Sequence, residues 1–231
     1  MYTSKDILFH IKHYENELTE SYQLLGFLES GAVKGNTSVA QSSIEEVIKH
    51  IKFICFFTSC FLDIASSLRG LVDCDTHWER KFYLKNGFVV IYESVKTFGK
   101  HQKEIHSLIK SDFPQLEHRY KVITQNLRKL KKEHKYDKII ATFRNKAGAH
   151  YDENFEAYFE NLKLIDKPIS VKTLSDFANF LMSLIVFWSD LIDIFNNKTE
   201  KDMRAAKEKI SGNDVTVITA DLTNSESNEN C

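Results

Sequence analysis

The sequence predicts an all-α protein, a helical bundle of about six helices. The 231 residues include only 2 prolines and 8 glycines, and so few chain breakers favour long helices over a fold with many turns. Apolar residues also recur at helical spacing along most of the chain. The segments between these periodic stretches are short, which is typical of a bundle.

The composition narrows the class of protein. A formal net charge of -1 supplies no global field to attract nucleic acid, so any phosphate site must be local. The four cysteines form no CxxC pair and no metal-ligand spacing, which indicates a reducing cytosol. We find no signal peptide and no stretch of ~20 residues apolar enough to span a bilayer, so we expect a cytoplasmic protein without membrane contact.

The first two helices are expected from about Lys5 to Glu29 and from about Ser43 to Val72. The first has one apolar stripe, formed by Ile7, Ile11, Tyr14, Leu18, Leu25 and Leu28. Ser43 and Glu46 have the spacing of a capping box, which places the second start at Ser43. The stretch "IKFICFFTSCFLDIA" is apolar on more than one face, so this helix is either central or carries an oligomer contact.

The third helix is expected from about Trp78 to Phe98, with Gly99 at its end. The side chains expected to point inward are Phe82, Val89, Tyr92, Val95 and Phe98. Pro114 suits the first turn of the next helix, which ends in the cationic run "RKLKKEHK". Such a run complements a helix C-terminus and is usually solvated; contact with an RNA backbone is the weaker interpretation.

A short helix is expected at "YDKIIATFRNKAGAH", followed by a mixed loop that holds Pro168. The last helix should run from about Thr173 to Phe195. The sequence therefore predicts a helical domain over residues 1–198 and a polar, flexible tail over residues 199–231, in which "VTVITA" could pair as a strand if a partner edge were present.

One short motif contains residue types that could bind a phosphate and transfer a proton. In "IIATFRNKAGAHYDENF", Arg144 and Asn145 precede His150. An Arg fork binds two phosphate oxygens and stays charged, and a His moves protons near neutral pH. On an unbroken helix Arg144 and His150 would lie about 9 Å apart along the axis and ~120° apart in rotation, so they would not meet. A bend at Gly148, or a second copy across a two-fold axis, would bring them together.

These residues resemble a known family. "RNKAGAH" is similar to the Arg-polar-x4-His motif of HEPN domains, all-helical proteins of prokaryotic toxin–antitoxin, abortive-infection and RNA-targeting immune systems. The resemblance implies a homodimeric, metal-independent and cofactor-free endoribonuclease, with an antitoxin or defence-system protein as a further partner. By this match Arg144 holds the phosphate, Asn145 orders the site and His150 transfers protons, while Lys146 and Tyr151 would contact the RNA. In one HEPN subgroup, toxins that a nucleotidyltransferase modifies, the pattern is Arg-x4-His-x-Tyr. Here five residues separate Arg144 from His150, and Tyr151 follows His150 at once, so this modification of the tyrosine is not expected.

Other interpretations remain open. An Arg and a His near a helix end often only complement the helix dipole. A non-catalytic helical module that binds RNA, nucleotide or a partner protein is the alternative function, and a purely structural helical protein is a third. His10 and His13 have ligand spacing on a helix, but no acidic or Cys partner completes a metal site.

Overall fold

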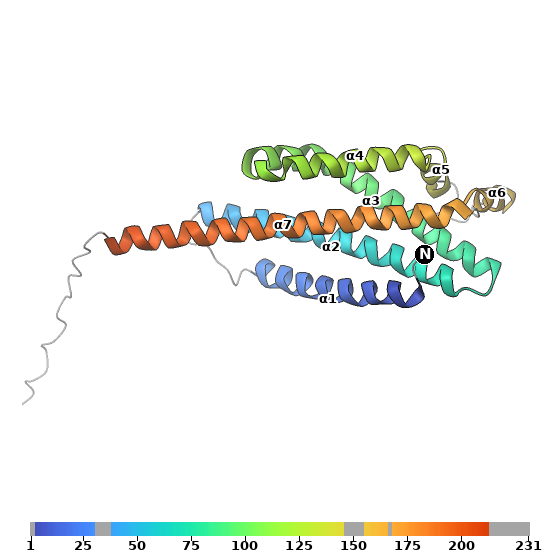
Figure 1. The fold of residues 1–231 in the computed structure, drawn as a ribbon, viewed down its shortest axis with the longest axis horizontal. Coiled ribbons are helices and arrows are strands. Elements are labelled where there is room, and N and C mark those ends of the chain that lie inside the picture. Colours follow the sequence, from blue (N-terminus) through green and yellow to red (C-terminus); the bar gives the residue numbers. More distant parts are fainter. Residues whose placement is uncertain (1–2, 31–37, 146–154, 166–167, 213–231) are drawn as a thin grey trace, which may run out of the picture. The chain divides into compact units, whose positions relative to one another are not determined.

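The fold is all-α, as the sequence predicts (Figure 1). The computed structural model describes residues 3–30, 38–145, 155–165 and 168–212, and these residues contain no strand. The elements are α1 (Ser4–Glu29), α2 (Ser38–Asp73), α3 (His77–Asp112), the 3-10 turn η1 (Pro114–Leu116), α4 (Glu117–Glu133), α5 (Ile140–Phe143), α6 (Phe155–Ile165) and α7 (Pro168–Gly212). The chain divides into two units, residues 1–192 and 193–231.

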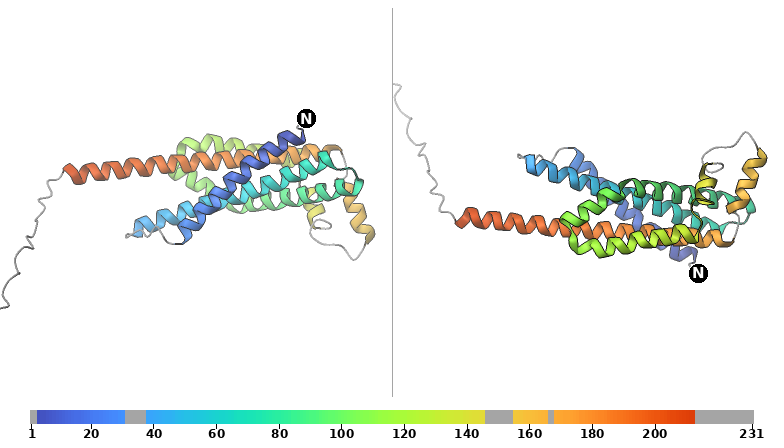
Figure 2. Two further views of the ribbon diagram at one scale, coloured as in Figure 1. Left: turned by 90° about the horizontal axis from the view of Figure 1, so that it is seen from below. Right: turned by 90° about the horizontal axis from the view of Figure 1, so that it is seen from above.

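The first unit is a bundle whose core is largely aromatic. Phe53 of α2 stacks on Trp188 of α7, with ring centroids 5.3 Å apart and planes 10° apart. Phe98 of α3 meets Phe180 of α7 edge-on at 5.9 Å. Such offset and edge-to-face pairs add to the burial of apolar area, so α7 is held against both α2 and α3. In the two views of Figure 2, α5 and α6 lie together at one end of this bundle.

Two glycines permit close helix packing. A Cβ on Gly87 of α3 would lie 2.6 Å from a side-chain carbon of Leu174 of α7, and a Cβ on Gly70 of α2 would lie 2.3 Å from the Tyr83 ring of α3. Real Cβ atoms do not approach this closely, so both helices accept a residue of low helix propensity in exchange for close contact.

Several predicted boundaries are wrong. α2 begins at Ser38, so Ser43 lies inside the helix and not at its start. α3 continues through Gly99 to Asp112 because Ile105 and Ile109 extend its buried face, and one glycine costs a helix only about 1 kcal/mol. A real capping box closes the start of α3, where Thr76 and Glu79 satisfy each other's backbone N–H groups.

The inward face of α3 also differs from the prediction. Phe82 is 53% exposed, and Val89 and Tyr92 are only half-buried. Val95 and Phe98 are buried as predicted, but the rest of the buried stripe is rotated away from Phe82, Val89 and Tyr92 and consists of Leu84, Phe88, Ile91, Ile105 and Ile109. This rotation leaves Tyr92 at the edge of the core, where it can contact polar groups.

The end of the chain is more helical than expected. α6 occupies part of the predicted loop, with Tyr158, Leu162 and Ile165 buried at helical spacing. α7 starts at Pro168 and runs to Gly212, so residues 199–212, predicted as tail, are helical. Residues 213–231, including "VTVITA", lie outside the described residues.

Two helices are long and apolar enough to cross a membrane, Ile44–Asp73 and Ile169–Phe195, so the expectation that no stretch reaches this limit is wrong. Packing inside the protein also explains why these helices are apolar, because 44% and 50% of their most apolar 18-residue stretches are buried within the protein. The core helices of a bundle show the same composition.

Candidate functional site

Arg144 stands at the end of a short helical turn that is anchored in the core. Ile140 and Phe143 of α5 are fully buried, and the Phe143 ring meets Phe88 of α3 edge-on at 6.0 Å. Arg144 and Asn145 follow in a π-helical turn, a geometry common at functional sites. Because the preceding turn is buried, the backbone of Arg144 is held in place while its side chain reaches the surface. Asn145, the next residue, is exposed.

Two residues of α3 hold the guanidinium of Arg144. Its Nε donates a hydrogen bond to Glu93 Oε1 at 2.8 Å, and its Nη2 lies 2.7 Å from the same oxygen. Its central carbon lies 5.2 Å from the centre of the Tyr92 ring, a cation–π contact. Of its five N–H groups, Glu93 engages two, and no other described residue accepts from the remainder.

The Tyr92 ring belongs to a stacked pair that carries further cations. Tyr92 and Tyr136 are nearly parallel, with centroids 6.1 Å apart, and the Tyr136 hydroxyl donates to the Tyr92 carbonyl at 3.2 Å. Lys96 lies over Tyr92 and Lys131 over Tyr136, at 5.6 and 4.6 Å from the ring centres. Burial raises the pKa of Tyr136, so its hydroxyl stays protonated and keeps donating. Three cations therefore gather around one aromatic pair.

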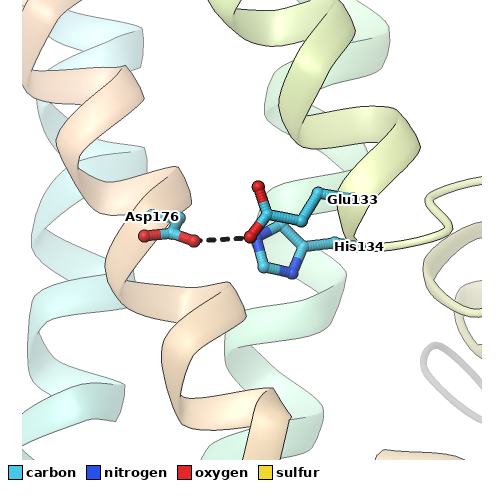
Figure 3. Close-up of side chains that lie close together, drawn as sticks. All are labelled: Glu133, His134 and Asp176. Atoms are coloured by element: carbon cyan, nitrogen blue, oxygen red, sulfur yellow. Dashed lines mark hydrogen bonds and ion pairs between the residues drawn. The ribbon is translucent and has the colours of Figure 1, made fainter.

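A second cluster fixes the turn that leads into α5. His134, buried at the end of α4, lies with Nε2 2.8 Å from Asp176 Oδ2 and Nδ1 2.9 Å from the Thr173 hydroxyl. Figure 3 shows how Glu133, the last residue of α4, and His134, which follows it, face Asp176 of α7. Lys172 joins the same group, with Nζ 2.6 Å from Glu133 Oε1 and 2.7 Å from Asp176 Oδ2.

Glu133, His134 and Asp176 also offer three ligand atoms within 4.8 Å of one another, the arrangement of a candidate metal centre. The Lys172 ammonium, however, already bridges the two carboxylates. Hydrogen bonds to Asp176 and Glu133 raise the pKa of Lys172, and the bond from Lys172 lowers the pKa of Glu133. Since both ring nitrogens of His134 are engaged as well, we interpret the cluster as a clamp between α4 and α7.

The predicted site residues are therefore only partly described. Arg144 and Asn145 follow α5, Arg144 half-buried and Asn145 exposed, and their roles stay predictions. Lys146, His150 and Tyr151 lie outside the described residues, so the meeting of Arg144 with His150 stays a prediction. Sequence reasoning missed Glu93 and Tyr92 as neighbours of Arg144, because a contact across 51 residues, as between Glu93 and Arg144, leaves no local pattern.

Comparison with known proteins identifies no relative. No family model, no curated protein and no solved structure matches this chain.

Proposed function

We propose that this protein is a metal-independent endoribonuclease of the HEPN type, acting in phage defence or as a toxin. The observation that carries the proposal is Arg144, a half-buried guanidinium fixed by Glu93 and Tyr92, with N–H donors that no other described residue accepts. The all-α bundle is consistent with the family that the motif resembles.

The reaction would be an internal transesterification. The 2′-oxygen of one nucleotide attacks the adjacent phosphorus, the 5′-oxygen of the next nucleotide leaves, and a 2′,3′-cyclic phosphate remains. His150 would transfer protons, taking one from the 2′-hydroxyl or giving one to the leaving oxygen, and Arg144 would bind the phosphate oxygens as negative charge develops. Asn145 would orient one of these groups.

The Arg144–Glu93 pair is compatible with phosphate binding on energetic grounds. The two side chains are 31% and 38% exposed, and a surface ion pair of this kind contributes only about 0–1 kcal/mol. An Arg–phosphate pair forms charge-assisted bonds roughly twice as strong as neutral ones. RNA can therefore engage the outer edge of the guanidinium while Glu93 keeps its orientation.

The Arg144–Glu93 pair also favours the alternative function, a non-catalytic module that binds RNA. A carboxylate beside Arg144 also repels phosphate, which would suit a non-catalytic module that binds RNA weakly through this patch. The two functions differ in one observable: the nuclease cleaves bound RNA and the module does not.

The test is incubation of purified full-length protein with total RNA in EDTA, followed by analysis of the cleaved ends. We expect 2′,3′-cyclic phosphate ends, and a loss of rate of about 10² or more for Arg144→Ala and for His150→Ala. His118→Ala, which changes an exposed histidine of α4, is the matched control and should cleave normally. Binding of intact RNA without cleavage would favour the module, and a fully active His150→Ala protein would refute the nuclease.

The proposal includes a homodimer, because the six-residue spacing places Arg144 and His150 on different faces of a continuous helix. Mixing Arg144→Ala chains with His150→Ala chains tests it. A shared site should regain part of the activity, since some mixed dimers would hold one site with both intact groups. A monomer at micromolar concentration that still cleaves RNA would refute the shared site but not the nuclease.

A further inference from the structure

The charge of this chain is strongly uneven. Residues 119–144 contain nine Lys or Arg and two acidic residues, a net charge of +7, although the whole chain carries -1. In contrast α1 (Ser4–Glu29) contains five acidic residues and two lysines. A polyanion would therefore be attracted more strongly to the part of the protein that residues 119–144 form than to α1.

The helical positions place many of these cations on one surface. On α4 the buried side chains include Tyr120, Ile123, Leu127 and Leu130, whereas Lys121, Arg128 and Lys132 follow one another at spacings of seven and four on the exposed side. On α3, Lys96, Lys100 and Lys103 continue the exposed side beyond Tyr92. We call this surface the α3–α4 cationic face; it consists of Lys96, Lys100, Lys103, Lys121, Arg128, Lys131 and Lys132.

The two rows of cations belong to neighbouring helices. α3 and α4 contact each other, and the Tyr120 hydroxyl of α4 donates to the Gln102 carbonyl of α3 at 3.1 Å. The Lys131–Tyr136 and Lys96–Tyr92 contacts tie both rows to the stacked tyrosines. The face therefore leads to Arg144, which rests on the same Tyr92 ring.

The cations of this face have no carboxylate partner among the described residues, whereas cations beside it do. Arg119 pairs with Asp190 on the flank of α4 that faces α7, and Lys49 pairs with Glu104 on the flank of α3 that faces α2. Glu93, which follows Tyr92 in the sequence, is engaged by Arg144. Concentrated and uncompensated charge of one sign raises the local concentration of a polyanion.

We infer that the α3–α4 cationic face binds the sugar-phosphate backbone of single-stranded RNA and leads it to Arg144. This inference rests on the proposed function for the choice of RNA among polyanions. A single strand is required because the 2′-oxygen must line up with the leaving 5′-oxygen, which a rigid A-form duplex prevents. Since the contacts are lysines and an arginine to phosphate, binding is independent of base sequence and strongly dependent on salt.

The experiment measures binding without cleavage. The probe is a fluorescein-labelled 12-nucleotide 2′-O-methyl RNA, which lacks the attacking hydroxyl, and the readout is fluorescence anisotropy of the full-length protein over a range of salt concentrations. The test variant is Lys121→Gln/Arg128→Gln/Lys132→Gln. The control variant removes the same charge elsewhere, from exposed lysines of α1 and α6, as Lys5→Gln/Lys12→Gln/Lys163→Gln.

We expect the test variant to bind roughly 10- to 100-fold more weakly at low salt, and the slope of log K against log salt to fall by about 2, from ~0.7 for each of the three lost phosphate contacts. The control variant should change neither the affinity nor the salt dependence appreciably.

Equal losses of affinity in both variants would overturn the inference, because a general charge effect would then explain binding. So would a test variant that binds the oligonucleotide normally but loses binding to vesicles of equal phosphatidylglycerol and phosphatidylcholine, because the face would then recognise anionic lipid. Because the probe cannot be cleaved, failure of the nuclease proposal leaves this result unaffected.

Discussion

Lowering the pH from 7.5 to 4.5 is expected to destabilise the bundle through one buried histidine of α2. His50 is 3% exposed and lies against the Trp188 ring, with centroids 5.2 Å apart. Neither ring nitrogen has a hydrogen-bond partner among the described residues, and the nearest carboxylate oxygen, on Glu46, is 3.9 Å from Nε2. Burial, together with the charge of Lys49 and against an opposing effect of Glu104, lowers the pKa of His50 from 6.5 to about 4.

The sign follows from where the proton binds. Between about pH 6.5 and pH 4 the unfolded chain protonates His50 and the folded protein does not, so the free energy of unfolding falls as the pH falls through this window. With 1.36 kcal/mol for each pKa unit, the loss between pH 7.5 and pH 4.5 is about 2.5 kcal/mol. This is a large part of the stability of an ordinary domain.

The assay is urea unfolding, followed by circular dichroism at both pH values, for the wild type and for His50→Phe. Phenylalanine removes the titrating group and can stack on Trp188 in its place, so the variant should lose about 2.5 kcal/mol less than the wild type over the same interval. Comparing the two proteins cancels the carboxylates that also titrate near pH 4. His118→Gln, at an exposed position, should behave like the wild type. If His50→Phe and the wild type lose stability equally, His50 is not buried as described.

Three further predictions concern the packing. Gly87→Ala should cost about 1–3 kcal/mol because the new Cβ would meet Leu174, whereas Gly26→Ala, with open space around it, should gain roughly 0.5–1 kcal/mol; thermal unfolding of both variants checks this. Thr76→Ala should lose about 1 kcal/mol by removing the cap of α3, and Thr76→Ser should restore it; an unchanged urea midpoint in the Ala variant would argue against the capping box. Asp176→Asn should cost about 1–3 kcal/mol because it weakens the bond to buried His134, while Glu133→Gln, on the exposed side of the same clamp, should leave the thermal midpoint nearly unchanged.

The sequence by itself determined the fold class and the position of Arg144. Scarce proline and glycine and the helical apolar period are local properties, so they predicted an all-α fold that the structure confirms. The predicted short helix at residues 136–150 is shorter than expected, because residues 136–139 form turns and α5 spans only Ile140–Phe143, with Arg144 and Asn145 directly after it; residues 146–150 lie outside the described residues. The motif likewise drew attention to His150, whose role stays a prediction.

Only the tertiary structure decided where the helices end and what surrounds Arg144. Gly87 and Gly99 both signal a break by local propensity, but packing against Leu174 and burial of Ile105 keep α3 intact. The face of α3 that enters the core is set by α2 and α7 together, and it turned Tyr92 to the edge of the core. Glu93 and Tyr92 of α3 reach the guanidinium group from a distant part of the chain. Local sequence carries no record of such pairings, because they depend on which helices pack side by side.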